Sequence, residues 1–131
     1  MGNVAVIQGI YDAFATGDIP GVFANMHPGT VWNEAENFPY AVSNPHVGPD
    51  AILAGVFGPI MGDWDGFSAT PEQILDAGDH VVALGRYTGT AKSTGTPLNA
   101  QFAHVWRLAD GKVESFQQYA DTLQAVRALG G

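Results

Sequence analysis

The chain has 131 residues, of which 46% are hydrophobic and 14% are charged, so its length and composition suit one domain with an ordinary packed core. Its formal net charge is −8 and its five basic residues are scattered, so we expect it to bind neither nucleic acid nor anionic membranes, which require a positive surface. With no cysteine, the chain has no disulfide, no thiolate nucleophile and no sulfur-ligated metal.

Other features point to a protein that works without a membrane, a metal or an organic cofactor. No run of about 18 uninterrupted apolar residues is present, so no membrane span is expected. The opening stretch MGNVAVIQGIYDAF has a helical pattern and no basic start, so we expect no signal peptide and a cytoplasmic protein. The four histidines lack metal-ligand spacing, and no glycine-rich phosphate loop is found. An apolar small molecule is the expected partner.

The first half of the chain predicts mainly helices. Apolar side chains recur at helical spacing over Asn3–Thr16, and a short second helix is expected over Ile19–Met26 with Asp18 as its N-cap. The alternating segment TVWNEA, Thr30–Ala35, predicts a strand. After a proline-rich loop, a third helix is expected over Pro49–Ile60.

The second half changes to the two-residue period of strands. A final short helix is expected over Thr122–Leu129, with Asp121 and Gln124 spaced as a capping box. Helices followed by an antiparallel meander predict an α+β fold with the helices grouped on one face of the sheet. The strands are expected over Phe67–Ala77 (with a break near Pro71), Val81–Lys92, Leu98–Leu108 and Val113–Ala120.

Alternation places His104 on the inner face of its strand. This face is the larger and more aromatic one, because it also carries Phe102, Trp106 and Leu108. A histidine there either lines a pocket or is a core residue hydrogen-bonded to a neighbour.

The cross-strand partner of His104 depends on the turn that follows its strand. A two-residue turn at Asp110-Gly111 places His104 opposite Gln117. A three-residue turn beginning at Ala109 places it opposite Phe116, near Gln118. The second alternative is favoured, because it brings Phe116 to the inner face.

The remaining candidate residues each have a functional and a structural interpretation. Glu34 shares a strand face with Trp32, and an apolar cleft there would raise its carboxyl pKa and suit it to acid–base chemistry; the alternative is an exposed glutamate at a strand end. Asp121 is explained by capping the last helix. Tyr11 is either core or functional, and Tyr40 is either a pocket lid or surface.

The segments IYDAFATGDIPGVFANM, TVWNEAENFPY, GTAKSTGTPLNAQFAHVWRLADGKV and QQYADT together resemble the NTF2-like superfamily, and within it the SnoaL-like polyketide cyclases and ketosteroid isomerase-related proteins. The resemblance covers nearly the whole chain as a single domain, residues 1–131. It implies a cone-shaped barrel in which a curved antiparallel sheet wraps around helices and encloses one apolar pocket, often in a dimer. We expect a homodimer through the outer face of the sheet, where Gln101, Ala103 and Val105 leave a nearly uncharged surface.

The resemblance also implies site residues. Alignment on GDI at Gly17–Ile19 brings the general-base aspartate of the steroid isomerases onto Glu34. The hairpin likewise brings their protonated oxyanion-hole aspartic acid onto His104. Their oxyanion-hole tyrosine falls on Ile10, one residue before Tyr11. The SnoaL-type cyclases instead use an aspartate near the end of the last strand with a pocket histidine, which Asp121 and His104 match.

Together these observations predict a small-molecule-pocket protein, either a cofactor-free isomerase or an aldol-type cyclase acting alpha to a carbonyl. The rival hypotheses are a non-catalytic ligand-binding or association domain and, third, an epoxide hydrolase-like enzyme built on Arg86 and Asp121. The expected catalytic residues are Glu34, His104 and Asp121, and the expected substrate-binding residues are Tyr11, Trp32, Tyr40, Phe102, Trp106 and Gln118.

Overall fold

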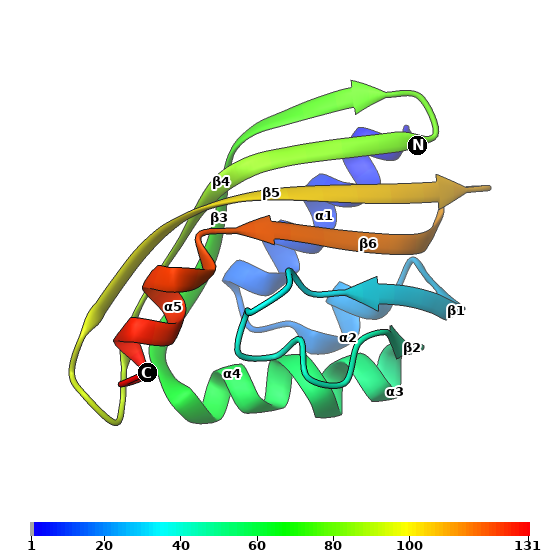
Figure 1. Ribbon diagram of the computed structural model, residues 1–131. Helices are drawn as coiled ribbons and strands as arrows, with labels where there is room; N and C mark the ends of the chain where they lie inside the picture. The colour runs from blue at the N-terminus through cyan, green and yellow to red at the C-terminus, as the bar shows by residue number, and fades with distance from the viewer. Residues whose placement is uncertain (1) are drawn as a thin grey trace.

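The computed structural model describes residues 2–131 and has the predicted α+β architecture. One six-stranded sheet has the order β2-β1-β6-β5-β4-β3, and the long strands bend so that the sheet arches over helix α1 without closing on itself (Figure 1). In the described part of the chain, no helix is both long and apolar enough to cross a membrane.

The N-terminal elements pack against the concave face of the sheet. Helix α1 (Asn3–Ala15) buries Val6, Ile7, Ile10 and Tyr11 and packs against β3 and β4. Helix α2 (Ile19–Phe23) is shorter than the predicted Ile19–Met26, because Met26 already begins strand β1 (Met26–Asn33). Asp18 caps α2 as predicted, accepting the Gly21 N–H at 3.0 Å.

A helical stretch lies below the sheet, alongside β1 and β2 (Figure 1). The predicted single helix is observed as α3 (Pro49–Ile52), a π-helical turn η1 (Leu53–Phe57) and α4 (Gly58–Asp63). Pro59 follows the π turn, and its ring would clash with a carbonyl one α-turn back, which the wider turn relieves. Strand β2 (His46–Val47) was not predicted; it lies in the proline-rich segment and pairs with Trp32 and Val31 of β1.

The meander forms the long strands β3 (Trp64–Ala77), β4 (His80–Ala91), β5 (Pro97–Ala109) and β6 (Lys112–Ala120), each within a few residues of its predicted bounds. The predicted break near Pro71 is a register shift between Pro71 and Gln73. Gly85 lies opposite this shift, and a Cβ there would come within 2.1 Å of the Thr70 carbonyl oxygen. A glycine at position 85 therefore allows β3 and β4 to approach where the sheet bends.

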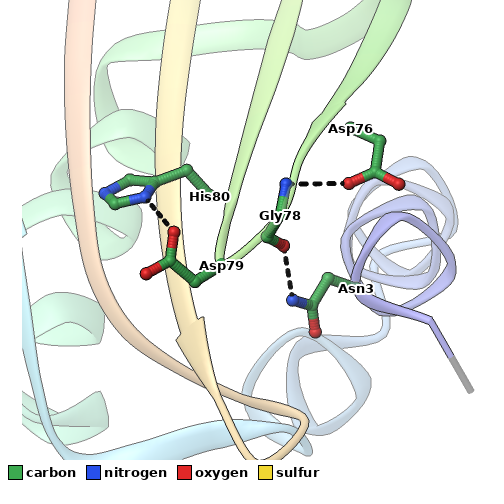
Figure 2. A network of polar contacts seen from close by, with 5 residues as sticks. All are labelled: Asn3, Asp76, Gly78, Asp79 and His80. Atoms are coloured by element: carbon green, nitrogen blue, oxygen red, sulfur yellow. Dashed lines mark hydrogen bonds and ion pairs between the residues drawn. The ribbon is translucent and has the colours of Figure 1, made fainter.

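The β3–β4 turn is tied to the start of α1 (Figure 2). Asn3 donates from Nδ2 to the Gly78 carbonyl at 3.0 Å, and the Asp76 carboxylate accepts the Gly78 N–H at the same distance. On the other side of the turn, His80 Nδ1 lies 2.7 Å from Asp79 Oδ1. The Asn3 contact joins the start of α1 to the edge of the sheet, and the other two contacts lie within the turn.

Neither predicted register of the β5–β6 hairpin is right. The turn has two residues, with φ of +51° at Asp110 and +75° at Gly111, as a type I′ turn requires. A bulge in β6, between the Leu108–Val113 and Arg107–Ser115 pairs, then shifts the register by one residue. His104 is consequently opposite Gln118, and Phe116 still faces the core.

Alternation along β5 is as predicted: Phe102, His104, Trp106 and Leu108 are buried. On the outer face Gln101 is exposed, while Ala103 and Val105 are half-buried. The homodimer through this face remains a prediction.

The last helix, α5 (Thr122–Ala128), packs against β5. Asp121 is its N-cap and accepts the Gln124 N–H at 3.2 Å. The Gln124 side chain donates to the Asp121 carboxylate and accepts the Asn99 N–H, so it does not complete the predicted capping box.

Candidate functional site

A small cavity lies between α1, the π-helical turn and the inner face of the sheet. Its volume is about 40 Å³, well below the roughly 300–1,000 Å³ of typical ligand pockets. Its walls are mostly aromatic and aliphatic, and none of the lining residues is a lysine or an arginine. The predicted site residues among them are Tyr11, Trp32, Glu34, His104, Trp106 and Gln118.

An apolar depression on the surface leads toward this cavity. It has a volume of about 270 Å³ and shares four lining residues with the inner cavity: Phe14, Phe57, Ile60 and Phe67. These four side chains border both spaces, so the depression and the inner cavity are adjacent.

Glu34 is buried in the cavity wall immediately after β1, with 3% of its surface exposed. Trp32 Nε1 donates to Oε2 at 3.3 Å, and Oε1 has no hydrogen-bond partner within residues 2–131. Burial raises the carboxyl pKa from 4.5 to about 8, and the Trp32 hydrogen bond offsets part of that rise. Glu34 is therefore neutral at pH 7 and has one oxygen free to meet a ligand.

His104 is buried between two tyrosines. Its Nδ1 lies 2.5 Å from the Tyr11 hydroxyl and its Nε2 lies 2.5 Å from the Tyr87 hydroxyl. The Phe102 ring stacks on the imidazole, with centroids 3.9 Å apart. Burial lowers the His104 pKa from 6.5 to about 3, so the ring is neutral at physiological pH.

The two tyrosine hydroxyls each accept a further hydrogen bond. Trp106 Nε1 donates to Tyr11 at 3.1 Å, and Gln118 Nε2 donates to Tyr87 at 2.7 Å. Burial raises the pKa of both phenols above the ordinary value, so both keep their protons. We call Trp106, Tyr11, His104, Tyr87 and Gln118 the histidine–tyrosine chain.

Tyr87 is the member of this chain that sequence reasoning missed. It lies on the inner face of β4, opposite Ala100 of β5, and lines the cavity. Its even spacing from Val81 and Ala83, which are also buried, was the signal that placed it on the inner face, whereas the residue predicted to be functional on this strand was Arg86. Arg86 points outward and is exposed.

Three predicted site residues do not line the cavity. Phe102 packs behind His104 and Tyr87, which do line it. The Tyr40 hydroxyl accepts a hydrogen bond from Trp64 Nε1 at 2.8 Å and donates to Asp63 Oδ2 at 3.0 Å. Asp121 borders a groove on the outer face of the sheet together with Arg86, and the two form no ion pair. The Asp–Arg pair expected of an epoxide hydrolase is thus on the other side of the sheet from the cavity.

The described residues show no group of three or more His, Asp or Glu side chains placed to hold a metal ion. The polar groups of the cavity can instead supply one carboxyl group and one hydroxyl hydrogen-bond donor. An apolar site with a carboxyl on one side and a donor on the other suits proton transfer to or from a bound molecule.

The chain resembles several solved structures over its whole length. An NTF2-like protein from Burkholderia thailandensis is 32% identical, with 100% of this chain and 99% of that chain covered and a TM-score of 0.95. TerC, co-crystallised with polyporic acid, is 25% identical, with 98% of each chain covered and a TM-score of 0.88. A protein of ketosteroid isomerase-like fold from Catenulispora acidiphila, in complex with trimethylamine, is 18% identical over 95% of this chain and 92% of that one, with a TM-score of 0.79.

A comparison with curated proteins gave no match. The family comparison matches residues 7–116 to the SnoaL-like domain, a span that includes Tyr11, Glu34, Tyr87 and His104. The chain therefore belongs to the SnoaL-like domain family of the NTF2-like superfamily.

Proposed function

We propose that the cavity binds a small, largely apolar carbonyl compound and moves a proton at the carbon alpha to that carbonyl, without a metal or an organic cofactor. The observation that carries this proposal is the buried Glu34, which has one carboxyl oxygen without a hydrogen-bond partner in residues 2–131 and lines the same cavity as Tyr11, His104 and Tyr87. Isomerisation and aldol-type cyclisation both begin with such a proton transfer.

In this reaction Glu34 is the general base. Its carboxylate removes the alpha proton, the electrons of that C–H bond form the enolate, and the negative charge develops on the carbonyl oxygen. The histidine–tyrosine chain supplies the hydrogen bond to that oxygen, where fixed donors in a dry site stabilise charge best. Because the Glu34 pKa is about 8, the carboxylate fraction, and with it the reaction rate, rises with pH through that value and levels off above it.

The fold family supports a small-molecule role without fixing the chemistry. TerC was crystallised with polyporic acid, and this chain is similar to TerC over nearly its full length. The competing function is a binding domain that uses the same cavity and performs no chemistry.

Hydrogen–deuterium exchange at the alpha carbon of cyclopentanone, followed by NMR in D2O, tests the proposal. We expect the protein to accelerate exchange, and Glu34→Gln to abolish the acceleration while cyclopentanone still binds. Glu36→Gln is the matched control, because Glu36 is exposed two residues away, and it should exchange at the wild-type rate. Binding of the ketone without any acceleration would favour the binding-domain function, and full activity in Glu34→Gln would place the base elsewhere.

A further inference from the structure

The hydrogen bonds around His104 can be counted proton by proton. A neutral imidazole donates from one ring nitrogen and accepts at the other. Tyr11 is bonded to Nδ1 and Tyr87 to Nε2. One tyrosine therefore donates its hydroxyl proton to the ring, and the other accepts a proton from the ring.

The outer partners of both tyrosines are donors only. The indole N–H of Trp106 can only donate, so the Tyr11 oxygen accepts it. The Gln118 amide is oriented by the backbone, because its Oε1 accepts the Ala35 N–H at 2.9 Å; its Nε2 therefore donates to Tyr87. Within residues 2–131, the tyrosine that accepts from the ring has no acceptor for its own proton.

Both tyrosine side chains line the cavity, so a ligand bound there is the available acceptor for the spare proton. Tyr87 is the tyrosine on the Glu34 side. Gln118 links its hydroxyl to Ala35, the residue next to Glu34, and the Glu34 charge contributes to raising the pKa of Tyr87. Tyr11 is linked instead to Trp106, and no effect of Glu34 on its pKa is found.

We propose that His104 is protonated on Nε2 and donates to Tyr87, so that the Tyr87 hydroxyl gives the single hydrogen bond to the carbonyl oxygen of a ligand whose alpha carbon faces Glu34. The hydrogen bonds of the chain then run in one direction, toward the Tyr87 oxygen. Trp106 donates to Tyr11, Tyr11 to Nδ1, and Nε2 together with Gln118 to Tyr87. Hydrogen bonds aligned in this way polarise one another and strengthen Tyr87 as a donor.

This arrangement, which rests on the proposed function, also specifies the substrate class. The site offers one hydroxyl proton, one carboxyl group and no cationic side chain. A ketone or aldehyde needs one donor at its oxygen, whereas a carboxylate or phosphate needs several donors or a positive charge to replace its water. The cavity is therefore built for a neutral compound with one carbonyl oxygen, and His104 and Gln118 are positioning residues that act through Tyr87.

The matched variants are Tyr87→Phe and Tyr11→Phe, each of which removes one of the two hydroxyl groups that are hydrogen-bonded to the His104 ring. In Tyr87→Phe we expect exchange of cyclopentanone to slow by about 10²–10³-fold, the loss typical of one oxyanion donor. In Tyr11→Phe the His104–Tyr87 bond persists, and the loss should stay below about tenfold. A larger loss in Tyr11→Phe than in Tyr87→Phe would overturn the assignment.

Two measurements test Tyr87 without relying on catalysis. The nitrogen NMR shifts of His104 in the wild-type protein should show a protonated Nε2 and a bare Nδ1; the opposite tautomer would overturn the proposal. The infrared carbonyl band of bound cyclopentanone should shift to lower frequency in the wild type and in Tyr11→Phe, and lose that shift in Tyr87→Phe. A wild-type protein that shows the shift but no exchange would refute proton transfer and leave the Tyr87 assignment standing.

Affinity tests the substrate class. Cyclopentanone should bind more tightly than cyclopentanecarboxylate at pH 6, where Glu34 is protonated and does not itself repel an anion. Equal or tighter binding of the carboxylate would contradict the single-donor arrangement.

Discussion

Glu34 and His104 lie in the wall of one cavity, and both are held in the neutral form by burial, yet their hydrogen-bonding states differ. Both ring nitrogens of His104 are occupied by tyrosine hydroxyls. Glu34 has one partner, Trp32, and within residues 2–131 its second oxygen has none. Burial alone does not mark a functional group; the group that keeps unused hydrogen-bonding capacity is the one prepared for a ligand, and the saturated group is part of the framework.

The largest expected effect is on the pH dependence of folding stability, to which Glu34 and His104 contribute in opposite directions. Unfolded Glu34 releases its proton near pH 4.5 and folded Glu34 near pH 8, so between these values the folded state binds the extra proton and stability falls as pH rises. For His104 the pKa falls from 6.5 to about 3, so stability falls as pH drops between those values. The two effects offset each other between about pH 4.5 and 6.5, where we expect the protein to be most stable.

Glu34→Gln should remove the fall in stability that the wild type shows as pH rises toward 8, and should keep the fall in stability at acid pH that His104 causes. The free energy of unfolding of the variant, relative to the wild type, should increase by roughly 3–5 kcal/mol between pH 4 and pH 9. Urea denaturation at a series of pH values measures it. Parallel profiles for the two proteins would mean that Glu34 titrates normally in the folded state.

The second effect should come from breaking the framework. His104→Leu leaves both tyrosine hydroxyls without their ring partner in a buried site, and we expect a loss of about 2–4 kcal/mol at pH 7. Glu34→Gln at pH 5 is the comparison, because it keeps a carbonyl oxygen for Trp32 and should cost less than about 1 kcal/mol. If the two substitutions cost the same, the contrast between a saturated and an open group would not hold.

Much of this arrangement could be predicted from the sequence. The two-residue period placed His104 and Trp106 on the inner face of β5, and the meander and its turns were located within a few residues. The resemblance pointed to Glu34 as a cavity residue. The helix caps at Asp18 and Asp121 followed from local spacing, because the groups that they bind lie within one helical turn.

The parts that could not be predicted depend on contacts between distant segments. A bulge of one residue in β6 decides that Gln118, and not Gln117, is opposite His104, and no local pattern at Glu114 or Ser115 marks it. Tyr87 joins the site because β4 pairs with β5 in one particular register. Each tyrosine contact of His104 joins two different elements, α1 to β5 for Tyr11 and β4 to β5 for Tyr87. The sequence therefore predicted a buried histidine without predicting its hydrogen-bond partners.

The smallest expected effect on stability is that of Asp121. Unlike Glu34 and His104, its carboxylate lies outside the cavity. It accepts the Gln124 N–H at 3.2 Å and a bond from the Gln124 side chain at 3.3 Å. Asp121→Ala removes this cap and should cost about 1 kcal/mol, whereas Asp121→Asn, which also caps well, should cost less than about 0.5 kcal/mol. Both variants should retain the wild-type exchange rate with cyclopentanone and the same fall in stability toward pH 8, since the residue lies on the outer side of the sheet. Loss of exchange in Asp121→Asn, with stability unchanged, would transfer the catalytic role from Glu34 to the end of β6.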